Sequence, residues 1–291
     1  MKTGFVPALG TPTDENGNLI AASYEKEIEK MIECGAVGLL SMGSMGIQAF
    51  LRNEVCVEVA ETAVKAAAGR VPVYVGCMDN SINRAKERMA SMEHLGLTAF
   101  VFTTPYYEID SRDQIMKYFK ALANSTKHGI VLYDLPGVTQ QKITYSMVFE
   151  LKKECKNFIG IKSADLYMLR HIRLNPDFAD FTTFYSGMDA FDIAYKWGIG
   201  NILDGMLPAT PKNTKAMIEA LDGGDYANAA RYLDNIISFR DFYIDNDLWP
   251  AFSATMNLLG FEGFFAPDWA TPVDHETVEK IRKKMIEIGE L

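Results

Sequence analysis

A lysine ends an apolar run within residues 157–165, which read NFIGIKSAD. The run is apolar enough to form a buried strand, so the amine of Lys162 must either reach solvent beyond an apolar stem or take part in chemistry. An apolar cavity favours the neutral amine, and the neutral amine is the nucleophile that a Schiff base requires. We therefore take Lys162 as the candidate nucleophile, with an exposed position at the rim as the alternative.

A tyrosine ends the preceding apolar run. Alternation along a strand places Val131 and Tyr133 on one face, and it places Gly160 and Lys162 on one face of the next strand. The phenol and the amine can therefore point into the same cavity, where Gly160 would leave room for the lysine. A buried tyrosine is usually part of the core, so Tyr133 by itself is a weak signal.

Two other runs end in segments that carry hydroxyl groups. Residues 41–46, SMGSMG, form a glycine-flanked turn whose backbone N–H groups and Ser44 hydroxyl could hold a carboxylate. Residues 103–107, TTPYY, end another run with two tyrosines. Glycine turns and rim tyrosines also occur without function, so each segment alone indicates little.

Eight short apolar runs alternate along the chain with longer segments of helical period. The expected strands span residues 5–10, 37–42, 71–76, 99–103, 130–133, 158–162, 181–185 and 201–204. The expected helices between them span residues 23–33, 53–67, 82–95, 112–125, 145–154, 166–174, 190–197 and 212–221. Three more helices are expected at residues 226–244, 251–259 and 273–288, with no strand between them.

This alternation predicts an α/β fold with a parallel sheet. Eight repeats within roughly 220 residues fit a closed (β/α)8 TIM barrel better than an open doubly wound sheet. We expect the barrel to span residues 1–222 and a C-terminal helical extension packed on it to span residues 223–291. In such barrels the active site lies at the C-terminal ends of the strands, which is where Lys162, Tyr133 and Ser44 fall.

Composition argues against several other classes of function. Of the 291 residues, 48% are hydrophobic and 23% are charged, as in ordinary soluble globular proteins. The formal net charge of −9 argues against a nucleic-acid or anionic-membrane surface, which needs clustered Lys and Arg. The four cysteines include no CxxC pair, so neither a zinc site nor a disulfide framework is indicated. The N-terminus lacks the apolar core of a signal peptide and no apolar run approaches a membrane span, so we expect a cytoplasmic protein.

Five motifs together resemble one known family. They are GSMG at 43–46, TTPYY at 103–107, LYDLPG at 132–137, GIKSAD at 160–165 and YSGMDA at 185–190. Their order and spacing are similar to those of the dihydrodipicolinate synthase and N-acetylneuraminate lyase family. The resemblance implies a (β/α)8 barrel with a C-terminal helical extension, a homotetramer built as a dimer of dimers, and no metal or organic cofactor.

The resemblance also implies roles for single residues. Lys162 resembles the family's Schiff-base lysine, which attacks the C2 carbonyl of pyruvate, and Tyr133 resembles the phenol that moves the proton. Ser44 stands where the family places a hydroxyl that binds the keto-acid carboxylate and links the proton relay. Tyr107 resembles the tyrosine that crosses the tight dimer interface to complete the relay of the neighbouring site. Gly187 matches the glycine of the seventh-strand motif.

The chain departs from the family pattern on the side of the second substrate. Met45 and Ile47 replace the second hydroxyl and the glutamate of the usual G-[ST]-T-G-E turn, although the backbone N–H of Met45 could still contact pyruvate. Val138 stands where the synthases carry the arginine that binds the carboxylate of aspartate semialdehyde. Of the acidic pair with which sialic-acid lyases hold sugar hydroxyls, only Asp189 remains, followed by Ala190.

These departures predict an apolar acceptor side. Its members are Met45, Ile47, Val138, Met188 and Met206, with Asp189 as the one group for a substrate hydroxyl. Packing of the loops is the simpler explanation for any one methionine. We predict a class I, pyruvate-dependent aldolase or lyase that cleaves or condenses a 2-keto-3-deoxy or 4-hydroxy-2-keto acid with an aldehyde partner, as N-acetylneuraminate lyase does. The alternatives are dihydrodipicolinate synthase itself and a keto-acid-binding barrel without turnover.

Overall fold

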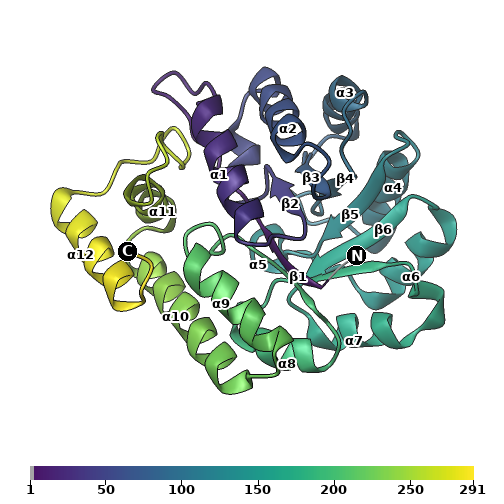
Figure 1. Ribbon diagram of the computed structural model, residues 1–291. Coiled ribbons are helices and arrows are strands. Elements are labelled where there is room, and N and C mark those ends of the chain that lie inside the picture. The colour runs from purple at the N-terminus through teal and green to yellow at the C-terminus, as the bar shows by residue number, and fades with distance from the viewer. Residues whose placement is uncertain (1–2) are drawn as a thin grey trace.

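The computed structural model describes residues 3–291, and its centre is one sheet of eight parallel strands surrounded by helices (Figure 1). The strand order is β1-β8-β7-β6-β5-β4-β3-β2. The strands are β1 Gly4–Pro7, β2 Leu39–Ser41, β3 Val73–Gly76, β4 Ala99–Phe102, β5 Gly129–Tyr133, β6 Phe158–Ser163, β7 Thr182–Tyr185 and β8 Asn201–Asp204. All eight strands fall within or beside the ranges that the sequence predicts.

Hydrogen bonds close the sheet on itself between β1 and β2. Ala8 and Leu40 form a parallel bridge just beyond the end of β1. The N–H of Leu9 donates to the carbonyl of Leu40 at 2.9 Å, and the N–H of Val37 donates to the carbonyl of Phe5 at 3.0 Å. The predicted (β/α)8 barrel is therefore confirmed.

Helices follow the strands in the predicted alternation. The barrel helices are α1 Ala21–Glu33, α2 Asn53–Ala67, α3 Ile82–Met92, α4 Arg112–Ala123, α6 Tyr145–Glu154, α7 Leu166–Leu174, α8 Phe191–Lys196 and α9 Pro211–Asp222. Four short helices were not predicted: α5 Pro136–Thr139, η1 Gln48–Phe50, η2 Pro176–Phe178 and η3 Met188–Ala190. Each is only a single turn, too short to show a hydrophobic period.

The alternation of side chains along the strands creates two cores. One fills the barrel and contains ten buried residues: Val6, Ala8, Leu40, Tyr74, Ala99, Val101, Val131, Tyr133, Phe184 and Leu203. Within it the rings of Tyr74 and Phe184 meet edge to face, with their centroids 5.2 Å apart. The larger core lies between the sheet and the helices, where the alternate strand residues such as Phe100, Leu132 and Ile161 pack.

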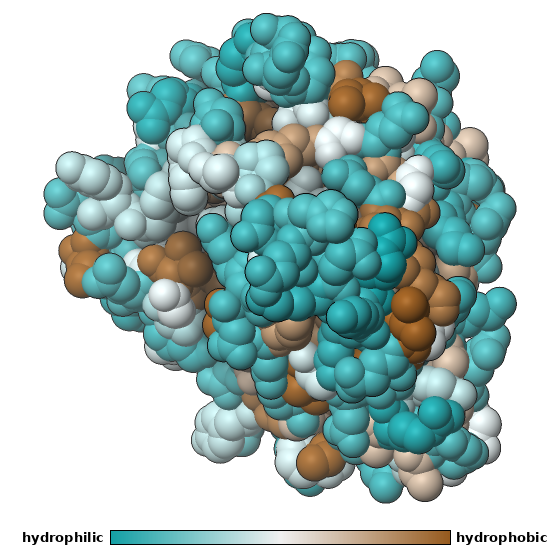
Figure 2. Space-filling view, turned by 90° about the vertical axis from the view of Figure 1, so that its left-hand side faces the viewer, coloured by the Kyte–Doolittle hydropathy of each residue, from teal (hydrophilic) through white to brown (hydrophobic). Residues whose placement is uncertain are grey.

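The C-terminal extension consists of α10 Tyr226–Asp245, α11 Leu248–Leu258 and α12 His275–Glu287. Its first helix, α10, packs against α9 and α8 of the barrel. The buried carboxylate of Glu290 accepts hydrogen bonds from the N–H groups of Lys212 and Asn213 at the start of α9. The side of the molecule that carries α11 and α12 is mostly hydrophilic, with separate apolar patches (Figure 2). The proposed division at residues 222 and 223 stays a prediction.

Helix α11 begins three residues earlier than predicted, at Leu248 instead of residue 251. The expected range of residues 251–259 starts directly after Pro250. Pro250 is the third residue of the helix, where the missing N–H would have no partner within the helix anyway.

A fully buried glutamate lies on the barrel side of α1. Glu27 has no exposed surface, and its Oε1 accepts the N–H of Gly10 at 2.9 Å. Within residues 3–291 its Oε2 has no hydrogen-bond partner. Burial raises the pKa of Glu27 to about 8, against the opposing effect of the Gly10 hydrogen bond.

This pKa makes stability depend on pH. Between about pH 5 and pH 8 the unfolded chain has released the Glu27 proton while the folded chain keeps it, so this group lowers the free energy of unfolding as pH rises, by at most roughly 1.4 kcal/mol per unit. Glu27→Gln keeps an oxygen for Gly10 but does not titrate. We expect urea denaturation to show the variant gaining stability relative to wild type across this window. Glu25→Gln, at an exposed position of the same helix, is the control; equal pH profiles for Glu27→Gln and wild type would contradict the prediction.

Candidate active site

Lys162 and Tyr133 lie side by side at the C-terminal ends of β6 and β5. They are partners in the register of the two strands. The Nζ of Lys162 lies 3.8 Å from the centre of the Tyr133 ring. Lys162 is 5% exposed and Tyr133 is 8% exposed, so the amine does not reach solvent as a rim lysine would. A cation over an aromatic face is attractive, and the contact holds amine and phenol together in the barrel mouth.

An irregularity in the pairing of β5 and β6 decides the direction of the lysine. Ile130 pairs with Phe158, whereas the next residue, Val131, pairs with Gly160, so β6 contains one extra residue. Strict alternation would put Lys162 on the same face as Phe158, which packs against the helices. The bulge reverses that face and turns Lys162 into the barrel, as bulges beside active sites often do.

Gly160 is needed for close packing of the strands rather than for the lysine. A Cβ at this position would lie 2.8 Å from the carbonyl oxygen of Thr182 and 3.4 Å from Val131 Cγ2. The space that the sequence analysis assigned to Lys162 is therefore occupied by the neighbouring strands.

A buried polar network supports the two strand ends from the helix side. The Asp134 N–H donates to the Lys162 carbonyl at 2.9 Å, and the Ser163 hydroxyl donates to Asp134 Oδ2 at 2.7 Å. Lys142 pairs with Asp134, and its Nζ lies 3.2 Å from Asp165. This network was not predicted from the sequence. The sequence signal for it is the polar residue directly after each candidate residue, Asp134 after Tyr133 and Ser163 after Lys162. At these positions the side chain must face away from the barrel interior.

The turn after β2 carries Ser44 at an exposed position. Met42 and Ile47, on either side of it, have positive φ angles of 55° and 49°. The hydroxyl of Thr11 donates to the carbonyl of Gly46 at 2.8 Å, which ties the turn to the loop after β1. The turn is thus held at the barrel mouth, with Ser44 free to meet a ligand.

The three candidate methionines lie in different surroundings. Met45 reaches across the mouth to the end of β8, because a Cβ at Gly205 would lie 2.0 Å from its Cγ. Met188 is 2% exposed and Met206 is 3% exposed, and both belong to the core between sheet and helices. Of the three, only Met45 is placed over the strand ends.

Val138 and Ser44 line one pocket of about 410 Å³. Val138 lies on α5 and is 62% exposed. Thr103 at the end of β4, Leu135 after β5 and Trp249 on α11 line the same pocket. The volume suits a small-molecule site, and the pocket adjoins the strand ends that carry the candidate residues.

Asp189, predicted to hold a substrate hydroxyl, is paired with an arginine. Both of its carboxylate oxygens accept hydrogen bonds from Arg240 of α10 at 2.8 Å, and this guanidinium also binds Asp241. Arg240 holds the pKa of Asp189 below its ordinary value. The preceding Gly187 gives room to a tyrosine, since a Cβ there would lie 2.4 Å from the hydroxyl of Tyr185.

Tyr107 lies on the surface of its own chain, where it is 83% exposed. Its neighbour Tyr106 is 39% exposed and lines the 410 Å³ pocket. The structure thus brings Lys162, Tyr133 and the Ser44 turn to one mouth but leaves Tyr107 on the outer surface.

Asp204 is a further acidic group that the sequence analysis missed. It ends β8, and its Oδ1 accepts the N–H of Met206 at 2.9 Å. Burial raises the pKa of Asp204, while the positive charge of Lys162 acts in the opposite direction. The carboxyl is therefore close enough to respond to the candidate nucleophile.

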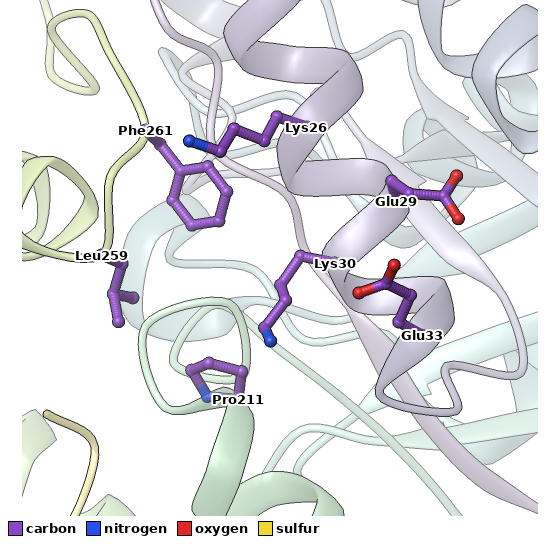
Figure 3. A pocket seen from close by; sticks show the side chains of 7 residues that line it. All are labelled: Lys26, Glu29, Lys30, Glu33, Pro211, Leu259 and Phe261. Atoms are coloured by element: carbon purple, nitrogen blue, oxygen red, sulfur yellow. The ribbon is translucent and has the colours of Figure 1, made fainter.

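Another hollow, of about 320 Å³, lies outside the barrel between α1 and the loop after α11 (Figure 3). Lys26 and Lys30 point toward it, and Lys26 Nζ donates to the carbonyl of Gly260 at 2.7 Å. None of the candidate site residues lines it.

Within the part of the chain that the structure describes, no cluster of three or more His, Cys, Asp or Glu side chains could hold a metal ion. In the same part, no helix has the length and apolar character required to span a membrane.

Comparison with known proteins gives concordant results. The 4-hydroxy-tetrahydrodipicolinate synthase of Shewanella baltica is 33% identical over 226 residues, which are 77% of this chain and 76% of that protein. The enzyme of the same name from Exiguobacterium sibiricum is 30% identical over 257 residues, or 87% of this chain and 83% of that protein. The N-acetylneuraminate lyase of Proteus mirabilis is 19% identical with a TM-score of 0.91, over 100% of this chain and 99% of that one, which supports the fold.

The two bacterial synthases favour the synthase alternative over the predicted likeness to N-acetylneuraminate lyase. Only the shared fold supports that likeness. The sequence model of the dihydrodipicolinate synthetase family matches residues 1–287, nearly the whole chain. The chain therefore belongs to the dihydrodipicolinate synthetase family, which confirms the family and the carbon–carbon lyase class that the five motifs predicted.

Proposed function

We propose that Lys162 forms a Schiff base with pyruvate and that the enzyme then makes or breaks a carbon–carbon bond between pyruvate C3 and an aldehyde. The observation that carries this proposal is the buried Lys162 amine, 3.8 Å from the Tyr133 ring at the C-terminal ends of the strands. A lysine in this position is largely withdrawn from solvent. Covalent catalysis gives it a role there.

The chemistry needs only groups at this mouth. The neutral amine attacks C2 of pyruvate, and loss of water together with uptake of one proton gives a protonated imine. The imine withdraws electrons from C3, so a proton or an aldehyde can leave C3 and an enamine forms. Tyr133 carries the proton as the bond forms or breaks. Because the imine itself is the electron sink, we propose that no metal or organic cofactor takes part.

Other groups would hold the keto acid. The Ser44 hydroxyl and the backbone N–H of Met45 would bind its carboxylate, as the turn at the barrel mouth allows. Asp204, which responds to the charge of Lys162, would face the protonated imine. Asp134 and Ser163 would act only by positioning, because they lie behind the strand ends.

We also propose a cytoplasmic homotetramer built as a dimer of dimers. The exposed Tyr107 supports this assembly, because its ring would be covered if it entered the site of a neighbouring chain. Its role in a proton relay would then require the partner subunit.

A second candidate function is 4-hydroxy-tetrahydrodipicolinate synthase, the activity named for the two similar bacterial proteins. The acceptor of that reaction carries a carboxylate, and an unpaired buried charge costs several kcal/mol. Val138 offers no partner for it. We therefore prefer a lyase or aldolase for a 2-keto-3-deoxy or 4-hydroxy-2-keto acid with few further charges.

Covalent trapping tests the proposed function. Pyruvate followed by borohydride should leave one reduced adduct on the peptide that contains Lys162, measured by mass spectrometry, and should abolish activity. Lys162→Arg should form no adduct, because a guanidinium stays protonated at any working pH. Lys156→Arg is the control and should behave as wild type, because Lys156 is exposed and lies just before the N-terminal end of β6. An adduct on another lysine would overturn the assignment.

Tyr133→Phe tests the proton transfer. The phenyl ring keeps the surface under Lys162 but loses the hydroxyl, so kcat should fall by roughly 10²- to 10⁴-fold. Pyruvate trapping on Lys162 should persist. Tyr118→Phe is the control, since its buried hydroxyl binds the Asp79 carbonyl outside the site. If kcat of Tyr133→Phe stays within a few-fold of wild type, the phenol is structural.

A further inference from the structure

The pocket of about 410 Å³ beside the catalytic strand ends is built from neutral residues only. Within the described chain, the residues that line it include no Asp, Glu, Lys, Arg or His. The polar groups of its lining side chains are the hydroxyls of Ser44, Thr103, Tyr106 and Thr139, the amide of Gln48 and the indole N–H of Trp249. A charged substituent of a substrate would therefore find no counter-ion among the lining side chains.

Two arginines beside the pocket are already paired. Arg88 donates to the carbonyl of the lining residue Met78 at 2.9 Å and pairs with Asp79 at 3.2 Å. Arg84 pairs with the same carboxylate at 2.7 Å. Neither guanidinium is available to a substrate carboxylate without breaking an existing ion pair.

Aromatic rings form one wall of the pocket. Phe50 and Trp249 both line it and meet edge to face, with ring centroids 6.0 Å apart. Trp269 packs edge to face on both of them, at 6.1 Å and 6.5 Å, and holds the pair in place. Tyr106, an exposed side chain at the pocket, adds a third ring to the lining. Such rings favour a flat apolar group, which can stack or meet them at an edge.

We propose that this pocket is the acceptor subsite and that it takes a neutral aldehyde with an aryl substituent. The inference rests on the proposed function, because the aldehyde must meet an enamine formed on Lys162. In condensation, C3 of the enamine bonds to the aldehyde carbon and the aldehyde oxygen takes up a proton. Water then hydrolyses the imine, which releases a 4-aryl-4-hydroxy-2-keto acid and the free lysine. Cleavage is the same sequence in reverse.

The test has two arms on the full-length enzyme as it assembles. Trapping of pyruvate by borohydride first establishes the adduct on Lys162. The second arm measures kcat/KM for condensation of pyruvate with benzaldehyde, aspartate semialdehyde and glyceraldehyde, with the products separated by chromatography. The kcat/KM for benzaldehyde should exceed that for aspartate semialdehyde by at least roughly 30-fold, the effect expected for a carboxylate without a partner. It should also exceed that for glyceraldehyde, whose substituent is neutral but hydroxylated.

Three variants locate the selectivity in the pocket. Val138→Arg should lower the preference for benzaldehyde over aspartate semialdehyde at least roughly tenfold, because it supplies the missing cation. Trp249→Ala should raise KM for benzaldehyde, and Phe50→Leu gives a milder version of the same effect if Trp249→Ala does not fold. Trp197→Ala is the matched control, because Trp197 packs on Arg170 outside the pocket.

The outcomes separate the two proposals. If no adduct forms on Lys162, the proposed function and this inference both fail. If the adduct forms but aspartate semialdehyde or glyceraldehyde reacts as well as benzaldehyde, only the assignment of an aryl aldehyde fails. A preference for benzaldehyde that Val138→Arg and both aromatic variants leave unchanged would also overturn it, because the selectivity would then lie elsewhere.

Discussion

The contact between the Lys162 amine and the Tyr133 ring is the interaction on which the site depends. A lysine that is 5% exposed loses most of its hydration, and the attraction of the aromatic face offsets part of that cost in free energy. The contact requires adjacent strands in the correct register. β5 and β6 lie in the middle of the sheet, and their pairing with β4 and β7 on the other sides supports that register.

The polar network behind the strand ends serves the same contact. Asp134 and Ser163 directly follow the two central residues, so alternation sends their side chains to the helix side. There Asp134 binds Ser163 and Lys142, and its N–H binds the carbonyl of Lys162. Since all these groups are bonded to one another, the strand ends are held in place without occupying the space in which a substrate would bind.

The acceptor side shows how one family scaffold admits different substrates. The loops after β2 and β5 supply Ser44 on one side of the pocket and Val138 on the other, and α11 of the extension supplies Trp249. Helices outside the barrel thus contribute to the site. In the function that we propose, Lys162 carries the chemistry and these neutral side chains set which aldehyde can be accommodated.

The sequence by itself determined the eight alternating units, the strand ends that carry Lys162 and Tyr133, and the family. These features are local, because hydrophobic period and short motifs can be read along the chain. Only the tertiary structure decided that a bulge in β6 turns Lys162 inward and that Arg240 engages Asp189, 51 residues away. It also placed Met206 in the core and Trp249 at the pocket. Such features depend on strand register and on contacts between distant segments, which neither period nor motif spacing encodes.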